Sequence, residues 1–203
     1  MGRTSNARDR LIKGAMRLIH TRSYAAVGVQ ELCAVAKVKK GSFYHFFEHK
    51  KALVLAVLDA WWIYTQKKNW DVTFVSTLPP LKRIEQFFEN NYEQNRFEYE
   101  KTGRFSGCPF GNLSIEMCTQ DEDIRAKMDA IFNDIITRLQ HTLDDAIAIG
   151  DLAPMDTRET ALALWAYCEG IQMLAKARQD LDLLKRLGKR AVRFLQRPEK
   201  HAA

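Results

Sequence analysis

Apolar side chains recur along this chain every three or four residues, the spacing that places them on one face of an α-helix. The longest regular run lies in residues 121–149 and consists of Ile124, Met128, Ile131, Ile135, Leu139 and Leu143. The first segment repeats the pattern with Leu11, Ala15, Leu18 and Ile19. No segment alternates apolar and polar residues with the period of two that a half-buried strand requires. The sequence therefore predicts an all-α protein.

Proline, glycine and capping residues divide this pattern into separate helices. Pro80 and Pro109 stand where helices begin, Asp121 and Asp156 are suited to cap helix starts, and Gly150 is suited to end a helix. A last helix is expected to follow Asp180 as its cap. The longer helices are expected at residues 4–21, 50–68, 80–101, 109–117, 121–149, 157–178 and 180–196.

Positive charge is concentrated in the first quarter of the chain. Up to Lys51 there are 11 Lys and Arg against 3 Asp and Glu, whereas the remainder has 20 against 22. The densest stretch, residues 36–53, reads AKVKKGSFYHFFEHKKAL and interleaves five lysines with four aromatic residues. An amphipathic helix with a solvated basic face would have a similar composition. The uneven distribution favours a nucleic-acid partner for this part of the chain.

The order of residues in this stretch predicts a helix-turn-helix. Val29, Leu32, Cys33 and Ala36 form the apolar face of a short helix, and the pair Lys37-Val38 makes the turn. The second helix would begin with two cations, an unhindered backbone and a hydroxyl, groups that bind phosphates and contact base edges. Tyr44 and His45 follow within one turn. The predicted recognition surface consists of Lys39, Lys40, Gly41, Ser42, Tyr44 and His45, with Lys50 and Arg10 on phosphates.

Residues 29–53, VQELCAVAKVKKGSFYHFFEHKKAL, resemble the DNA-binding domain of TetR/AcrR-type transcriptional repressors. That family has a helix, then Ala-Gly-Val-Ser, x-Gly-Thr-hydrophobic-Tyr-x-His/Tyr-Phe, and Lys. This chain has Lys37 where the family usually has Gly, Lys39 in place of a capping Ser, and Val27-Gly28 where Thr or Ser caps the first helix of the motif. The resemblance implies a helix-turn-helix domain over residues 1–51 and a helical ligand-binding and dimerisation domain over residues 52–203.

The resemblance further implies a homodimer that binds a near-palindromic double-stranded operator and is released by a small-molecule effector. Small residues near large ones in the last two helices, such as Ala166, Gly170, Ala177, Gly188 and Ala191, would suit helix packing across the two-fold axis or within one chain. Two-fold symmetry would place two recognition helices about 34–36 Å apart. Alternatives are a basic protein that binds DNA without sequence preference and an enzyme in the C-terminal part.

Aromatic and Met residues in the larger part suit a mostly apolar effector pocket, although each would equally fill a core. Glu116 is a further candidate polar group for this pocket. Residues 107–118, GCPFGNLSIEMC, also resemble a stretch found in one branch of the family. The predicted ligand-binding residues are Trp61, Trp62, Phe88, Tyr92, Cys108, Phe110, Asn112, Met117, Trp165 and Glu169.

Cys108 is the residue with the clearest chemistry of its own. The four cysteines are widely spaced without a CxxC motif, which predicts reduced thiols. Cys108 precedes a helix start, where backbone dipoles stabilise a thiolate, and Arg104 is near in sequence. It is therefore a candidate sensor for electrophiles, a candidate nucleophile if the fold brings His141 to it, or an inert packed thiol.

Other kinds of site are not expected. Residues 45–49 spell HxxEH, a zinc-binding pattern, but the flanking lysines would repel a dication. We expect no metal, no cofactor and no enzymatic activity. The sequence has no apolar run of transmembrane length and no signal peptide, so a cytoplasmic location without a membrane partner is expected.

Overall fold

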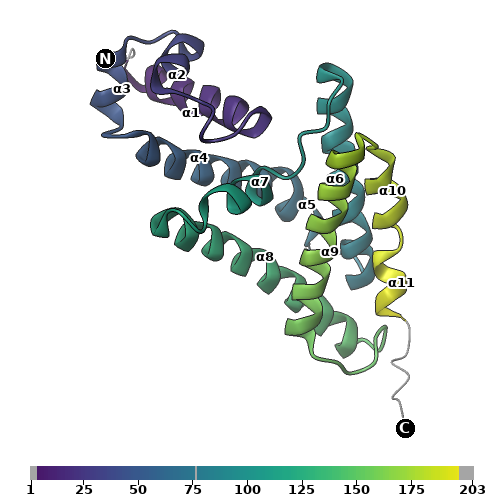
Figure 1. Cartoon of the computed structure of the whole chain (residues 1–203). Coiled ribbons are helices and arrows are strands. Elements are labelled where there is room, and N and C mark those ends of the chain that lie inside the picture. Colours follow the sequence, from purple (N-terminus) through teal and green to yellow (C-terminus); the bar gives the residue numbers. More distant parts are fainter. Residues whose placement is uncertain (1–3, 76, 197–203) are drawn as a thin grey trace. The chain divides into compact units, whose positions relative to one another are not determined.

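The computed structural model describes residues 4–75 and 77–196, and Figure 1 shows the helices in chain order. Within these residues the chain forms helices and no strand, which confirms the predicted fold class. Two compact units are present. One comprises residues 1–65 and 109–130, and the other comprises residues 66–108 and 131–203. The functional division expected after residue 51 stays a prediction.

The first unit contains the predicted helix-turn-helix. Its core includes Leu11, Leu32, Phe43, Leu53 and Leu58, none of which has any exposed side-chain surface. Leu11 belongs to the inner face predicted for the first helix, and Ala15 and Ile19 are buried with it. The helices of this unit are α1 (Thr4–Thr21), α2 (Val29–Ala36), α3 (Lys40–Phe46), α4 (Lys50–Thr65), α7 (Pro109–Met117) and the beginning of α8 (Glu122–Ala148).

The turn between α2 and α3 has the strained geometry expected from its sequence. Lys37 adopts the left-handed conformation, with a φ of 54°. This conformation costs a non-glycine residue about 1–2 kcal/mol. Gly28 precedes α2 without any side-chain cap, as expected where the family usually has Thr or Ser. Local capping therefore contributes little here, and α2 depends on its buried face.

The second unit is organised around aromatic rings. The Trp70 ring is stacked on Phe74 and tilted against Phe87, with 4.8 Å between centroids in each pair. The ring of Phe88 approaches the ring of Tyr167 edge-on, with 6.2 Å between their centroids. The helices of this unit are η1 (Gln66–Trp70), α5 (Asp71–Thr73), α6 (Pro80–Thr102), the rest of α8, α9 (Thr157–Arg178), α10 (Asp182–Gly188) and α11 (Ala191–Leu195).

Several helix ends match the sequence-based expectation. Asp121 caps α8 by accepting hydrogen bonds from the amides of Asp123 and Ile124 at 3.0 and 3.1 Å. Asp156 accepts one from the Glu159 amide at 3.0 Å and caps α9. Gly150, with a φ of 82°, follows the end of α8. These boundaries are local, so they could be predicted from neighbouring residues alone.

Two expected helices differ from the structure. The helix expected to run to residue 68 changes at Gln66 into a π-helical turn. The last helix, expected over residues 180–196, is divided into α10 and α11. Asp180 does not cap it; its carboxylate pairs with Arg186 at 3.1 Å. α10 ends at Gly188, where a Cβ atom would lie 2.9 Å from Phe88 Cβ, so a glycine permits this close approach to α6.

Candidate nucleic-acid interface and effector site

The predicted recognition residues lie on the outward face of α3. Lys39, Lys40, Gly41, Tyr44 and His45 are exposed, and Ser42 is half-buried. On the other face, Phe43 is fully buried and Phe47 nearly so, which anchors the helix to α1 and α2. The Lys40 ammonium lies 5.9 Å from the centre of the Tyr44 ring. This face therefore presents cations, a phenol and an imidazole together.

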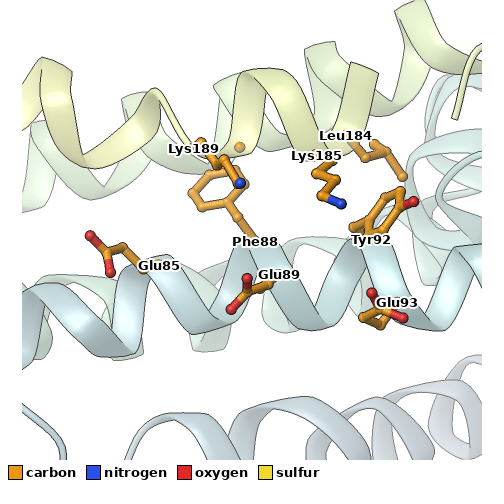
Figure 2. A pocket seen from close by; sticks show the side chains of 9 residues that line it. Glu85, Phe88, Glu89, Tyr92, Glu93, Leu184, Lys185 and Lys189 are labelled. Atoms are coloured by element: carbon orange, nitrogen blue, oxygen red, sulfur yellow. The ribbon is translucent and has the colours of Figure 1, made fainter. Parts of the chain in front are cut away.

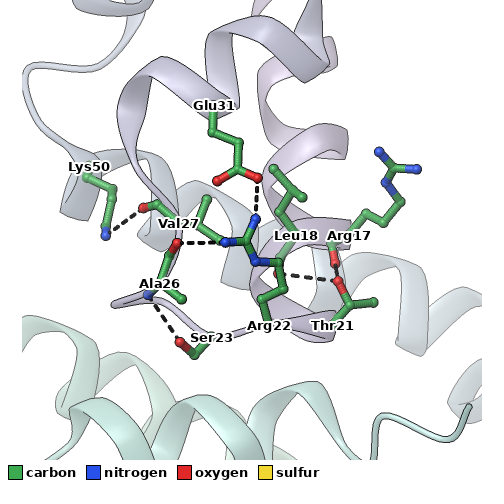
Figure 3. A network of polar contacts seen from close by, with 9 residues as sticks. All are labelled: Arg17, Leu18, Thr21, Arg22, Ser23, Ala26, Val27, Glu31 and Lys50. Carbon is green, nitrogen blue, oxygen red and sulfur yellow. Dashed lines mark hydrogen bonds and ion pairs between the residues drawn. The ribbon is translucent and has the colours of Figure 1, made fainter.

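Lys50 has a different role from the one expected. Its ammonium donates hydrogen bonds to the carbonyls of Tyr24 at 2.7 Å and Val27 at 2.9 Å, and lies 3.9 Å from the Tyr24 ring centre. Figure 3 shows Lys50 directed at the Val27 carbonyl. Burial lowers the pKa of Lys50, and the nearby Glu116 carboxylate partly offsets this. An ammonium held in this way disagrees with a phosphate contact. Arg10, the other predicted phosphate ligand, is exposed.

Glu116 also has a role that the sequence did not reveal. One oxygen of its carboxylate accepts a hydrogen bond from the Tyr24 amide at 2.8 Å, and the other accepts one from the Ala25 amide at 2.7 Å. Both amides belong to the α1–α2 loop, residues 22–28. Glu116 therefore links α7 to the helix-turn-helix.

Further polar contacts shape the α1–α2 loop (Figure 3). Arg22 forms an ion pair with Glu31 of α2 and donates a hydrogen bond to the Ala26 carbonyl at 3.2 Å. The Ala26 amide in turn donates to the Ser23 hydroxyl at 3.1 Å. The loop is thus held from three sides, by Glu116 on its amides, Lys50 on its carbonyls and Glu31 on Arg22. These contacts set the position from which α2 begins.

Three predicted effector residues meet in the first unit. The rings of Trp61 and Trp62 each approach Phe110 edge-on, with centroids 6.3 and 6.2 Å apart. Asn112 and Met117 belong to the same helix as Phe110, and Met117 is buried. α7 therefore carries both an aromatic group and, at Glu116, the link to the α1–α2 loop.

Phe88 and Tyr92 line a groove of about 340 Å³ between α6 and α10. Figure 2 shows α6 below the groove, with Lys185 of α10 and Lys189, which follows that helix, above it. Its floor is apolar, but its walls carry Glu85, Glu89, Glu93, Lys185 and Lys189. The Lys185 ammonium lies 5.4 Å from the Tyr92 ring centre. This surface is more charged than the mostly apolar pocket expected from the sequence.

A more apolar groove, of about 510 Å³, lies between α1 and α4 of the first unit. Its wall includes Ile63 and Tyr64, each about half exposed. Ile12 and Met16 of α1 also line it, and neither belongs to the inner face that the sequence predicted for this helix.

The remaining predicted effector residues lie in the second unit. Trp165 packs on Phe132 with centroids 5.7 Å apart. Cys108 is buried and shares a hydrogen bond with the Glu169 carboxylate. Burial raises the pKa of Glu169 to about 6, and the bond to Cys108 lowers it part of the way back. The structure therefore brings together a thiol and a carboxyl group that are distant in the sequence.

A side chain clamp holds the segment that leads to Cys108. The Gln179 side chain accepts a hydrogen bond from the Phe105 amide at 3.0 Å and donates one to the Phe105 carbonyl at 3.1 Å. Gln179 ends α9 in the left-handed conformation, with a φ of 52°. The sequence offered no signal for this contact, because Gln179 follows the expected helix as an ordinary polar residue.

Residues 45–49, which carry the HxxEH pattern, run from the end of α3 to the start of α4. His49 accepts a hydrogen bond from the Ala52 amide at 3.0 Å, at the first turn of α4. No cluster of three or more His, Cys, Asp or Glu residues suited to a metal ion occurs in the part of the chain that the structure describes. No helix within residues 4–75 and 77–196 is long and apolar enough to cross a membrane.

Comparison with known families agrees with this arrangement. Residues 11–57 match the family described as bacterial regulatory proteins, tetR family. Residues 80–191, more than half of the chain, match the tetracyclin repressor-like C-terminal domain. The chain belongs to the TetR family. It is accordingly a DNA-binding transcriptional regulator with an N-terminal helix-turn-helix and a larger helical part behind it.

Individual relatives extend over nearly the whole chain. The transcriptional regulator AcuR of Cereibacter sphaeroides is 31% identical over 85% of this chain and 77% of its own length. The transcriptional repressor NemR of Escherichia coli is 27% identical over 89% of each chain. A crystal structure of a TetR regulatory protein from Rhodobacter sphaeroides has a TM-score of 0.81 and 29% identity, covering 92% of this chain and 97% of that one. The likeness thus includes both the DNA-binding and the C-terminal parts.

Proposed function

We propose that the chain is a ligand-responsive repressor that contacts its operator through the exposed face of α3. Lys39 and Lys40 would neutralise phosphates together with Arg10, while Ser42, Tyr44 and His45 would read or position against bases. The observation that carries the proposal is the exposure of Lys39, Lys40, Tyr44 and His45 along a helix whose opposite face is anchored by buried Phe43. Lys50 is left out of the phosphate contacts because its ammonium is bound within the unit.

Salt dependence of DNA binding tests this proposal. An operator selected from random DNA would be titrated with wild type and with Lys40→Ala at several salt concentrations. Loss of one phosphate contact should lower the magnitude of the negative slope of log affinity against log salt by about 0.9. Lys50→Ala is the matched control, because it should reduce stability while leaving the slope unchanged.

A different signature is expected for base contacts. Tyr44→Ala should weaken the operator more than random DNA, since it removes a base-facing group rather than a charge. Equal losses on both DNAs would remove Tyr44 from sequence readout. A wild-type protein that binds random DNA as tightly as the selected operator would favour the alternative of a basic protein without sequence preference.

The repressor would act as a homodimer through α9. Leu162, Ala166, Gly170, Met173 and Ala177 follow one face of this helix at helical spacing. Met173 is 59% exposed, and a Cβ atom at Gly170 would meet no atom within 4 Å, so this face is open to a partner helix. Gly188 and Ala191 are instead used inside the chain, where Gly188 packs on Phe88 and Ala191 is fully buried.

Sedimentation of wild type and Met173→Glu tests the dimer. A charge placed on this face should shift the protein towards monomer, because burying an unpaired carboxylate is costly. Arg178→Glu, an exposed change near the end of the same helix, is the control. A wild-type chain that sediments as a monomer at micromolar concentration would contradict the proposal.

A small apolar or electrophilic effector would release the operator by shifting a population of conformations. α7 provides the connection, since it begins next to Cys108, carries Phe110 and reaches the α1–α2 loop through Glu116. A ligand acts only through its different affinities for the two states, typically 1–3 kcal/mol of coupling. The operator should then change ligand affinity by the same factor as the ligand changes operator affinity. Equal ligand affinity with and without operator would exclude this mechanism.

The protein would act in the cytoplasm and without catalysis. The relatives named above are transcriptional regulators, which supports a non-enzymatic role. Steady turnover of a thioester or another electrophile, lost in Cys108→Ser, would instead favour the enzyme alternative.

A further inference from the structure

The contact between Cys108 and Glu169 joins two segments that belong to different parts of the sequence. Cys108 directly precedes α7, and Glu169 lies in the second half of α9. The buried thiol and the half-buried Glu169 share a hydrogen bond within the second unit. Three residues earlier, Phe105 is clamped by Gln179 at the end of α9, so the segment is attached to this helix at two points. The position of Cys108 relative to Glu169 is therefore fixed by two contacts with α9.

Two further side chains of α9 lie beside the Glu169 carboxylate. Gln172 donates to one carboxylate oxygen at 3.4 Å, and Cys168 is close enough for the carboxylate to help raise its pKa. Burial is the main cause that raises the pKa of Glu169, and the hydrogen bond with Cys108 lowers it part of the way. Burial is also the main reason that the Cys168 pKa is raised, so this neighbouring thiol stays protonated.

This environment changes the expectation for Cys108. Its place before a helix start suggested a thiolate, but the hydrogen-bonded neighbour is a carboxylate. A negative charge beside a thiol disfavours the thiolate, so the resting form is a thiol that donates its proton to Glu169. Such a thiol is a weak nucleophile until a base removes the proton.

We propose that Glu169 is the general base that activates Cys108 towards a small α,β-unsaturated carbonyl compound. The inference rests on the proposed function, in which an electrophilic effector releases the operator. The sulfur attacks the β-carbon, an S–C bond forms and the C=C π bond breaks. The thiol proton passes to Glu169 and then to the α-carbon of the adduct, which restores the carboxylate. The reaction is an addition and requires no oxidant or reductant.

The properties of Glu169 suit this task. Its pKa of about 6 leaves it ionised at neutral pH, so it is available to accept a proton. The raised value also makes it a stronger base than an ordinary exposed glutamate, and general-base efficiency increases with basicity. The thiol is only 7% exposed, which favours compact electrophiles over bulky ones.

The test is the rate at which methyl vinyl ketone modifies Cys108 in the full chain, followed by mass spectrometry of the Cys108 peptide between pH 5 and pH 8. The wild-type rate should rise up to about pH 6 and then level off. Glu169→Gln, which keeps the size and an acceptor oxygen, should react roughly 100-fold more slowly at pH 7, at the low end of general-base contributions. Its rate should keep rising about tenfold per pH unit, following the thiolate.

Three controls isolate the role of the base. Glu159→Gln removes an exposed carboxylate from the same helix and should leave the rate unchanged. Thermal unfolding of Glu169→Gln verifies that the fold persists, and Glu169→Asp should retain the levelling of the rate near its own pKa. A Glu169→Gln variant that reacts as fast as wild type, or faster, would overturn the proposal, as would a wild-type Cys108 that forms no adduct.

Operator binding measured on the same samples separates this inference from the proposed function. If wild-type Cys108 forms the adduct with the predicted pH profile but the operator stays bound, Glu169 keeps its role and the electrophile-release function fails. If Cys108 in Glu169→Gln is modified as fast as in wild type and the modification releases the operator, the electrophile-release function stands. The role of Glu169 as general base is then overturned.

Discussion

The two units differ in the kind of contact that is most prominent in each, although both contain polar and aromatic contacts. In the first, carboxylate and ammonium groups reach backbone atoms, as Glu116 and Lys50 do on the α1–α2 loop. In the second, rings pack on rings, as Trp70 does on Phe74 and Phe87. Hydrogen bonds depend steeply on distance and angle, whereas apolar contacts are non-directional. A small shift of α7 would therefore disturb the first unit more readily than the aromatic core of the second.

This difference suits a repressor. The α1–α2 loop of the DNA-binding region is held by directional hydrogen bonds, which weaken when their geometry changes. The unit that contains Cys108 and Glu169 has an aromatic core around Trp70. The predictions below separate these two modes of stabilisation.

Truncation of the aromatic core should have the largest effect. Phe87 is 2% exposed, and Phe87→Ala should lower the free energy of unfolding by about 3–5 kcal/mol through the cavity that it leaves. Urea denaturation measures the loss. Phe97→Ala, at a ring that is 57% exposed, should cost far less. Equal losses in the two variants would contradict an aromatic core around Trp70.

Stability should also depend on pH through Glu169. Its folded-state pKa is raised from 4.5 to about 6, so the folded state binds this proton more tightly than the unfolded state. The contribution is fully present below pH 4.5 and is lost as pH rises through 6, by about 2 kcal/mol in all. Denaturation of wild type and Glu169→Gln across this window should show that the variant lacks this component. If the free energy of unfolding changed with pH in the same way for both proteins, Glu169 would not have a raised pKa.

Removal of the Glu116 link should cost less and act locally. Glu116→Ala leaves the amides of Tyr24 and Ala25 without their acceptor, which should lower stability by about 1–3 kcal/mol. Hydrogen exchange at these two amides should accelerate more than at the core of α6. Glu122→Ala, which breaks an exposed pair with Arg125, is the matched control and should change little. Unchanged exchange in the α1–α2 loop would exclude the link.

The smallest effect is expected at the turn of the helix-turn-helix. Lys37→Gly relieves a left-handed non-glycine residue, and the gain of about 1–2 kcal/mol is reduced by the larger entropy of the unfolded glycine chain. A net stabilisation of up to about 1 kcal/mol should appear in thermal unfolding. Lys39→Gly, at a neighbouring position with an ordinary φ of −77°, should not stabilise. Destabilisation by Lys37→Gly would indicate that the lysine side chain contributes more than its backbone strain costs.

Local features of this protein were determined by the sequence itself. The caps at Asp121 and Asp156, the left-handed Lys37 and the exposed face of α3 all depend on residues within about one helical turn of one another. The apolar spacing of α1 and α8 likewise sufficed for the all-α fold. The family pattern in residues 29–53 then pointed to DNA binding.

Only the tertiary structure decided which distant groups meet. Glu116 lies 92 and 91 positions from the amides it binds, and Glu169 meets Cys108 from another helix. Lys50 was predicted to bind phosphate because it lies in a basic segment. In the folded chain, two backbone carbonyls lie within hydrogen-bonding distance of its ammonium. A charged side chain binds whichever partner the folded chain places within reach. The periodicity of the sequence carries no information about that partner.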